Sequence, residues 1–256
     1  MNIVDVHCHY TYKNFQKDLD KTIKKMEKAG VKKVITNGLN PKDNKEVLKL
    51  ASKYKIVEAA IGIYPTEAGS MSDKELKEIL NQIEENKNNI IAIGEVGLDH
   101  HWTKDKKKKD RQKEVLREII KLADKIKKPI IVHSRNAESE TVEVMKEAKV
   151  PVIMHCFCGK LAPTNEAIKA GFYFSIPTMI VRSKTFKKLV KRAGLDKLLT
   201  ETDAPFLAPK SGERNDASNI TQSITKIAEV LKLDEQKVAQ KIYSNYKKVF
   251  NQQHSS

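Results

Sequence analysis

The chain has 256 residues, with 48 Lys and Arg against 33 Asp and Glu, which gives a formal net charge of +15 at pH 7. Hydrophobic residues make up 39% of it and charged residues 32%, a composition that excludes a disordered or fibrous protein. No apolar run approaches the ~18–20 residues of a membrane span, and no signal peptide is visible. Three Cys do not make a disulfide framework. We therefore expect a cytoplasmic protein that contacts no membrane.

Short apolar strands alternate with amphipathic helices along the chain. Strands are expected at residues 3–6, 31–36, 56–63, 90–93, 129–133, 151–155, 172–175 and 197–200. Apolar residues at helical spacing follow at 15–26, 47–51, 76–83, 115–126, 142–145, 167–168, 186–190 and 220–231, with a last helix at 238–249. Eight strand–helix pairs predict an α/β fold, a single (β/α)8 TIM barrel, in one domain over residues 1–256. No glycine-rich phosphate loop follows any strand, which disfavours nucleotide binding.

Metal-ligating residue types recur where the predicted strands end, the edge that carries the active site in such barrels. These residues are His7, His9, Glu95, His133, His155 and Asp203. His7 and His9 lie two residues apart on the first strand, so their side chains face the same side. Six nitrogen and oxygen ligands are more than one catalytic ion needs, and they suit two divalent ions with Glu95 as the bridge. These donors are those of a hydrolase and are compatible with Zn²⁺, Mn²⁺, Mg²⁺, Ni²⁺ or Fe²⁺. Among these we expect two ions of Mg²⁺ or Mn²⁺, with Zn²⁺ as the alternative.

Five short motifs occur in a fixed order between residues 5 and 205. They are Asp5-Val-His7-Cys-His9, Gly94-Glu95-Val-Gly-Leu-Asp99, His133-Ser-Arg135, His155-Cys-Phe and Glu201-Thr-Asp203-Ala-Pro205. Together they resemble the TatD family of metal-dependent deoxyribonucleases. The resemblance implies that one ion is held by His7, His9, Glu95 and Asp203, and the second by Glu95, His133 and His155. It also implies that Asp203 orients a water and accepts its proton, so Asp203 and Glu95 are the expected catalytic residues.

The resemblance further implies cleavage of phosphodiester bonds in DNA, from the 3′ ends of single strands, and the basic charge suits a nucleic acid, RNA included. Arg135 is placed to hold a phosphate bidentately, and Arg214 and Asn215 lie in the long loop after the eighth strand. Tyr64 stands where many relatives carry His, and it can hydrogen-bond a phosphate or stack on a base. We expect these four residues to bind substrate. Trp102, in the loop after the fourth strand, can stack on a base or simply pack within the loop.

Two other functions are compatible with the sequence. An ester or amide hydrolase, such as an aminoacyl-tRNA deacylase or a lactonase, would use the same barrel and the same metals. A nucleic-acid-binding protein with structural metals is disfavoured, because structural sites are usually closed whereas these residues surround a barrel mouth. No long coiled-coil pattern or large apolar stripe is evident, so no obligate protein partner is expected.

Overall fold

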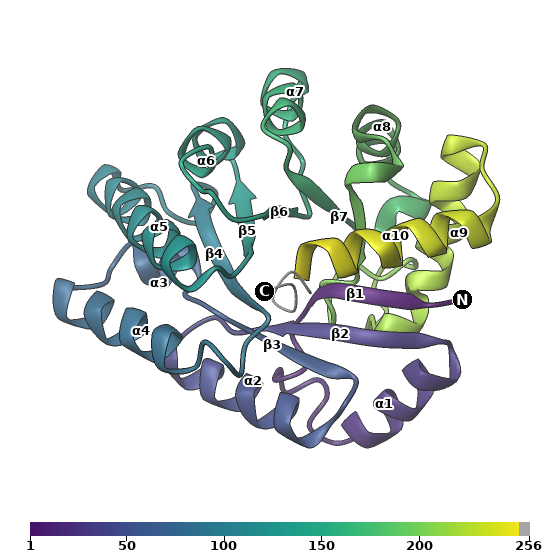
Figure 1. The fold of residues 1–256 in the computed structure, drawn as a ribbon, viewed down its shortest axis with the longest axis horizontal. Coiled ribbons are helices and arrows are strands. Elements are labelled where there is room, and N and C mark those ends of the chain that lie inside the picture. Colours follow the sequence, from purple (N-terminus) through teal and green to yellow (C-terminus); the bar gives the residue numbers. More distant parts are fainter. Residues whose placement is uncertain (251–256) are drawn as a thin grey trace. The chain divides into compact units, whose positions relative to one another are not determined.

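The computed structural model describes residues 1–250, in which eight strands alternate with helices (Figure 1). The strands are β1 (Ile3–Cys8), β2 (Val31–Asn37), β3 (Val57–Ile61), β4 (Ala92–Asp99), β5 (Ile130–Arg135), β6 (Val152–His155), β7 (Tyr173–Pro177) and β8 (Leu198–Glu201). They follow one another in the sheet in chain order, from β1 to β8. This order of parallel strands is that of a (β/α)8 barrel, so the predicted fold class is confirmed.

Helices follow the strands, and two of the longer ones begin at capping side chains. The α-helices are α1 (Leu19–Lys28), α2 (Pro41–Lys53), α3 (Pro65–Ala68), α4 (Asp73–Glu85), α5 (Lys106–Ile126), α6 (Glu138–Met145), α7 (Leu161–Lys169), α8 (Lys184–Ala193), α9 (Ile220–Leu231) and α10 (Glu235–Phe250), and the short 3-10 helices are η1 (Thr178–Val181), η2 (Leu195–Lys197) and η3 (Ala217–Asn219). Ser72 and Glu75 form a reciprocal capping box on α4. The carboxylate of Asp105 accepts a hydrogen bond of 2.9 Å from the N–H of Lys108, so α5 begins well before the apolar residues that predict it.

Contacts group the described residues into two compact units, of which the first comprises residues 1–36, 50–58 and 173–250. In this unit β1 pairs with β2, and β7 pairs with β8, all in parallel. The N–H of Asp203 donates to the carbonyl of His7 at 2.9 Å, and a bridge joins Cys8 to Ala204. These contacts place the segment after β8 beside β1. Helices α8, α9 and α10 pack against these strands.

The second unit comprises residues 37–49 and 59–172. Here β4 pairs in parallel with the end of β3 and with β5, and β5 pairs with β6. Helix α5 packs against β4 and against α4. Leu76, Ile79 and Ile83 of α4 and Val115 and Ile119 of α5 are buried. Each such side chain stabilises the fold by roughly 1.5–3 kcal/mol, so this helix layer holds the strands that carry the second set of predicted ligands.

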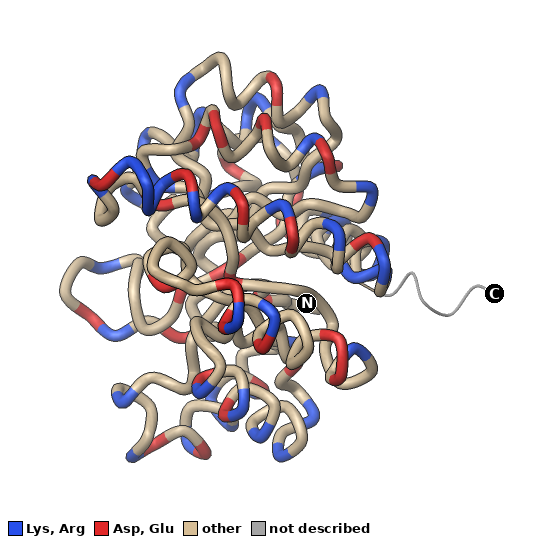
Figure 2. Tube along the Cα trace, turned by 90° about the vertical axis from the view of Figure 1, so that its left-hand side faces the viewer, with Lys and Arg blue, Asp and Glu red and all other residues tan. Residues whose placement is uncertain are grey.

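Lys and Arg alternate with Asp and Glu along many helices (Figure 2). Some pairs join successive helical turns, as between Lys106 and Asp110 at 3.0 Å and between Lys121 and Glu118 at 2.7 Å. Exposed pairs of this kind contribute about 0–1 kcal/mol each, so they stabilise the fold little. Within residues 1–250, no helix combines the length and the apolarity that crossing a bilayer requires.

Candidate metal centre

Three predicted ligands meet in the first unit, where β1 and the segment after β8 lie side by side. His7 is buried within β1, His9 directly follows that strand, and Asp203 follows β8. Nε2 of His7 lies 3.2 Å from Nε2 of His9, and Oδ1 of Asp203 lies 3.5 Å from the former and 3.4 Å from the latter. We call these three residues the His7 group. Two imidazole nitrogens and a carboxylate oxygen converge in it.

Asp5 ties β1 to the segment that carries Asp203. Its buried carboxylate accepts hydrogen bonds from the N–H of His7 at 3.2 Å, and from the N–H and the hydroxyl of Thr202 at 3.0 and 2.5 Å. Burial raises the pKa of Asp5 to about 7, although these hydrogen bonds oppose the shift. Asp203 has a φ of 56°, in the left-handed region that Asp tolerates better than most residues. These contacts fix the position of Asp203 relative to His7.

The other three predicted ligands meet in the second unit, one from each of three neighbouring strands. Glu95 lies in β4, His133 in β5 and His155 at the end of β6, and all three are buried. Oε1 of Glu95 lies 2.8 Å from Nδ1 of His133 and 3.6 Å from Nε2 of His155. One ligand atom from each residue lies within 4.8 Å of the other two, and we call these residues the Glu95 group. Burial alone would lower the pKa of His133, but hydrogen bonds to Asp99 and Glu95 outweigh it and raise that pKa to about 9.

Two glycines allow the strands of the second unit to approach each other at the Glu95 group. Gly97 pairs with His133 between β4 and β5, and a Cβ on Gly97 would lie 2.0 Å from the carbonyl oxygen of His133. A Cβ on Gly62, directly after β3, would lie 2.6 Å from the carbonyl oxygen of Glu95. Both distances are far below van der Waals contact, so only glycine permits this spacing of the strands.

Asp99 is not among the residues predicted to form the site, yet it contacts the Glu95 group. Its Oδ2 lies 3.1 Å from Nε2 of His133 and accepts a hydrogen bond of 3.2 Å from the hydroxyl of Tyr64. Burial opposes ionisation, but hydrogen bonds from His133 and from the N–H of Trp102 lower the pKa of Asp99. A carboxylate on the outer nitrogen of a metal-binding His fixes the orientation of the ring. The signal was present in the sequence, because Asp99 lies four residues after Glu95 and faces the same side of β4.

Two of the predicted substrate residues, Arg135 and Tyr64, lie close to the Glu95 group. Arg135 is the last residue of β5, is exposed, and has its guanidinium carbon 5.4 Å from the ring centre of Trp102. Among residues 1–250, no carboxylate forms an ion pair with Arg135. Tyr64 is half-buried, and its hydroxyl is directed at Asp99. Burial and the charges of Glu95 and Asp99 raise the pKa of the Tyr64 hydroxyl, so it remains a neutral donor.

The other two predicted substrate residues, Arg214 and Asn215, make contacts within the first unit. Arg214 forms a two-pronged ion pair with Asp18, with N–O distances of 2.8 and 2.6 Å. Asn215 is buried, and its amide donates to the hydroxyl of Thr178 at 2.8 Å and to the carbonyl of Thr202 at 2.9 Å. The side chains of Arg214 and Asn215, which the sequence predicts to bind substrate, therefore hold the loop after β8 in place in this structure.

Both ligand groups suit a divalent cation by the chemistry of their donors. Each offers two imidazole nitrogens and one carboxylate oxygen from side chains that are largely or fully buried. Bringing such groups together inside a protein is costly unless a cation or hydrogen bonds compensate them. Mixed nitrogen and oxygen donors without a thiolate are typical of catalytic Zn²⁺ and Mn²⁺ sites, and carboxylates also accept Mg²⁺. The residues present therefore fit bound divalent ions.

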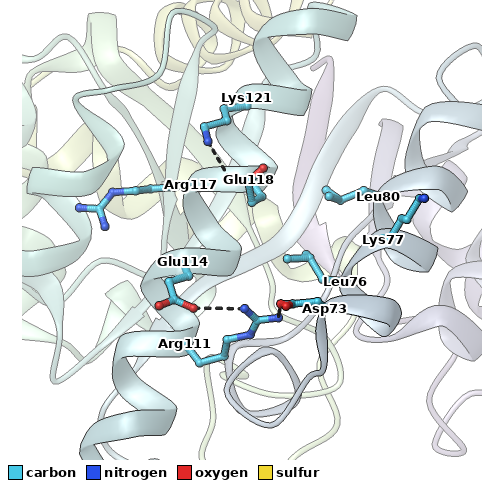
Figure 3. Close-up of a pocket in the computed structure, with 9 residues that line it drawn as sticks. All are labelled: Asp73, Leu76, Lys77, Leu80, Arg111, Glu114, Arg117, Glu118 and Lys121. Carbon is cyan, nitrogen blue, oxygen red and sulfur yellow. Dashed lines mark hydrogen bonds and ion pairs between the residues drawn. The ribbon is translucent and has the colours of Figure 1, made fainter.

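A groove of about 480 Å³ lies between α4 and α5 in the second unit (Figure 3). Its charged lining is partly paired, since Arg111 donates to Asp73 at 2.7 Å and to Glu114 at 3.1 Å. None of its nine lining residues is a predicted site residue. The groove is therefore a feature of the helix layer, separate from the Glu95 group at the strand ends.

Known proteins resemble this chain over nearly its whole length. Residues 4–251 match the family described as TatD related DNase. The chain is 35% identical to an uncharacterized metal-dependent hydrolase of Methanocaldococcus jannaschii, over 96% of both chains, and 33% identical to the human deoxyribonuclease TATDN3, over 98% of this chain and 95% of that one. The crystal structure of the TatD homolog YjjV from Escherichia coli K12 superposes with a TM-score of 0.89 at 26% identity, over 97% of this chain and 98% of that one. The chain therefore belongs to the TatD family and is a metal-dependent hydrolase.

Proposed function

We propose that this protein is a deoxyribonuclease that hydrolyses phosphodiester bonds of DNA from the 3′ ends of single strands. The observation that carries the proposal is the Glu95 group, a buried cluster of ligand atoms within 4.8 Å of one another in a chain of the TatD family. The relative TATDN3 is named as a deoxyribonuclease, which supports DNA as the substrate class. The formal net charge of +15 favours a polyanion in the same direction.

We propose that two divalent ions bind, Mg²⁺ or Mn²⁺, with Zn²⁺ as the alternative. The His7 group would hold the first ion and the Glu95 group the second, with Glu95 as a ligand of both. Support for this sharing comes from the motif at residues 94–99, which resembles that of the family. Bound ions would lower the pKa of a water and stabilise charge on the attacking and leaving oxygens of a phosphodiester.

Asp203 is the proposed proton acceptor. Its side chain keeps 18% of its surface exposed, whereas those of His7 and His9 keep 0% and 4%. Asp203 is therefore the member of the His7 group that water reaches most easily. A carboxylate in this position can orient a water and take its proton, a contribution of about 10²–10⁴-fold in rate.

Arg135 is the proposed phosphate ligand, because its exposed guanidinium lies two residues beyond His133 and has no carboxylate partner within residues 1–250. A guanidinium binds phosphate oxygens through two parallel hydrogen bonds. Tyr64, Arg214 and Asn215 already donate to groups of the protein, so their roles as substrate contacts stay predictions. Action in the cytoplasm and the lack of an obligate protein partner also stay predictions from the sequence.

The test is cleavage of end-labelled DNA by purified protein with Mg²⁺ or Mn²⁺. Single-stranded DNA labelled at the 5′ end should shorten progressively from its 3′ end, and faster than duplex DNA. Asp203→Ala and Glu95→Ala should each lose at least about 100-fold in rate, because each removes a carboxylate of the centre. Glu229→Ala, which removes an exposed carboxylate of α9, should cleave as the wild type does.

Three outcomes would contradict the proposal. Unaltered cleavage by both Asp203→Ala and Glu95→Ala would exclude the proposed centre as the source of activity. Intact DNA beside hydrolysed aminoacyl-tRNA or lactone would favour the ester hydrolase instead. Faster cleavage of RNA than of DNA of the same sequence would change the substrate class.

A further inference from the structure

Trp102 is the only Trp of the sequence, and it is 64% exposed. Single exposed hydrophobic residues are common, so exposure alone carries no function. Unlike an isolated exposed side chain, Trp102 lies in a loop whose main chain is fixed by hydrogen bonds. The main-chain N–H groups of Trp102 and His101 each donate a hydrogen bond of 2.8 Å to Oδ1 of Asp99. The loop that presents the indole is therefore anchored on the carboxylate that also contacts His133.

The indole of Trp102 lies beside a cation. The guanidinium of Arg135 stacks over the ring at 5.4 Å from its centre, and the ring of His101 lies perpendicular to it at 4.6 Å. Arg135 covers one face of the indole, and most of the side chain remains exposed. Lys104, in the same loop, donates to the carbonyl of His100 at 3.1 Å and adds a second positive charge. An open aromatic surface that contacts a guanidinium, in a loop with a further positive charge, is typical of surfaces that bind unpaired bases and their phosphates.

We propose that Trp102 and Arg135 form a subsite for single-stranded DNA, in which one base stacks on the indole and the adjoining phosphate binds the guanidinium. Both residues lie close in sequence to the Glu95 group. Arg135 follows His133, a member of the group, by two residues, and Trp102 follows Asp99, which contacts His133, by three. A base in a duplex is stacked between its neighbours and offers no face to the indole, so the subsite selects unpaired strands. The inference rests on the proposed function, for which it names a substrate contact.

The first test uses Trp102 as its own reporter, because no other Trp contributes to the emission. The full-length protein with Mg²⁺ is titrated with a decathymidylate whose phosphorothioate linkages resist cleavage, and binding is followed in parallel by the anisotropy of a fluorescein label. Stacking should quench the indole emission in proportion to binding. A strand of abasic units on the same backbone should bind without that quenching. Saturated binding of decathymidylate with unchanged emission would overturn the subsite.

The second test measures affinity in variants. Trp102→Ala should weaken binding of decathymidylate about 5- to 150-fold, the range of one base–aromatic stack, and Trp102→Phe should lose less. Leu233→Ala removes another exposed apolar side chain, in the loop between α9 and α10, and should bind as the wild type does. Arg135→Gln should lower the slope of log affinity against log salt by about 0.7, the value for one phosphate contact on a single strand. Wild-type affinity in Trp102→Ala would overturn the stack, and an unchanged slope in Arg135→Gln would overturn the phosphate contact.

Quenching and cleavage, measured on the same protein sample, distinguish the subsite from the proposed nuclease activity. Quenching by decathymidylate without cleavage of any DNA would support the subsite and contradict the nuclease. Cleavage of DNA without quenching would contradict the subsite and support the nuclease.

Discussion

Oδ2 of Asp99 lies 3.1 Å from Nε2 of His133, which leaves the other ring nitrogen of His133 directed at Glu95. The same carboxylate accepts hydrogen bonds from the hydroxyl of Tyr64 and from the main chain of Trp102. Asp99 thus connects the orientation of one candidate metal ligand with the loop that follows β4.

Asp99→Asn keeps the size of the side chain but removes the negative charge that accepts the N–H of His133. Affinity of the second ion should fall about 10- to 100-fold, the usual loss when such a carboxylate is removed from a metal-binding His. Calorimetric titration of metal-free protein with Mn²⁺ measures the loss. Asp105→Asn is the matched control, because Asp105 caps α5 and touches no predicted ligand. Equal affinities in the two variants would exclude Asp99 as an orienting residue.

Tyr64→Phe removes the hydroxyl that donates to Asp99 and keeps the ring. A hydrogen bond to a charged group contributes about 1.5–3 kcal/mol, and partial exposure of Tyr64 places the expected loss of unfolding free energy at the lower end of that range. Urea denaturation measures it. Because the pKa of Tyr64 is raised, the hydroxyl does not titrate in the working range, and the pH profile of hydrolysis should keep its shape in the variant. A displaced alkaline limb would show instead that Tyr64 takes part in proton transfer.

Gly97→Ala should disrupt the Glu95 group from within the sheet. The added Cβ would lie 2.0 Å from the carbonyl oxygen of His133, so β4 and β5 must separate, at a cost of at least about 2–3 kcal/mol. Thermal unfolding and metal content should both fall. Gly194→Ala is the control, since Gly194 has a positive φ of 70°, as Gly97 has one of 146°, but nothing lies within 4 Å of its Cβ, which leaves only about 1–3 kcal/mol of backbone strain and no contact with a predicted ligand. A similar effect of the two substitutions would mean that strain rather than the clash is responsible.

Asp18→Asn should destabilise the protein at neutral pH and not in acid. Hydrogen bonds from Arg214 lower the pKa of Asp18 in the folded state, so the pair stabilises the fold above the unfolded pKa of about 3.9. That stabilisation is lost as the pH falls through the folded pKa. Melting temperatures of wild type and variant should therefore differ at pH 7 and converge once the pH has fallen through the lowered pKa of Asp18, and added salt should narrow the gap at pH 7. A gap that persists in acid would locate the effect elsewhere than in the charge of Asp18.

The strand–helix alternation could be predicted from the sequence, whereas the limits of some elements could not. The run of apolar residues predicts that the fourth strand ends at residue 93, but β4 continues to Asp99. Residues beyond Ile93 pair with β5 even though several of them are polar. Helix α5 begins at Lys106, within a Lys-rich stretch that has no apolar periodicity. Helix α3 has only four residues, too few to show a helical period.

Residue types and their places at the strand ends were sufficient to nominate the six candidate ligands, and the resemblance to the TatD family implied how they divide between two ions. The spacing from Glu95 places Asp99 on the same side of the fourth strand, but the atoms that Asp99 contacts could not be predicted, because they depend on the register that sets Gly97 opposite His133 and Asp99 opposite Arg135. The ion pair between Arg214 and Asp18 joins residues 196 positions apart, so no local sequence pattern predicts it. Pairings of this kind depend on how distant segments are positioned against one another, which neither propensity nor periodicity specifies.

The His7 group has a consequence for the time at which the enzyme becomes complete. It unites the first strand with the segment after the last, and a hydrogen bond from Thr202 to Asp5 spans 197 residues of chain. A ribosome synthesises all three members of the Glu95 group before it reaches Asp203. Under the proposed mechanism, a chain still attached to its ribosome lacks the ligand that closes the first ion site. If the proposed function holds, the nascent protein is therefore unable to cut DNA until Asp203 has been synthesised and the segment after β8 has reached β1.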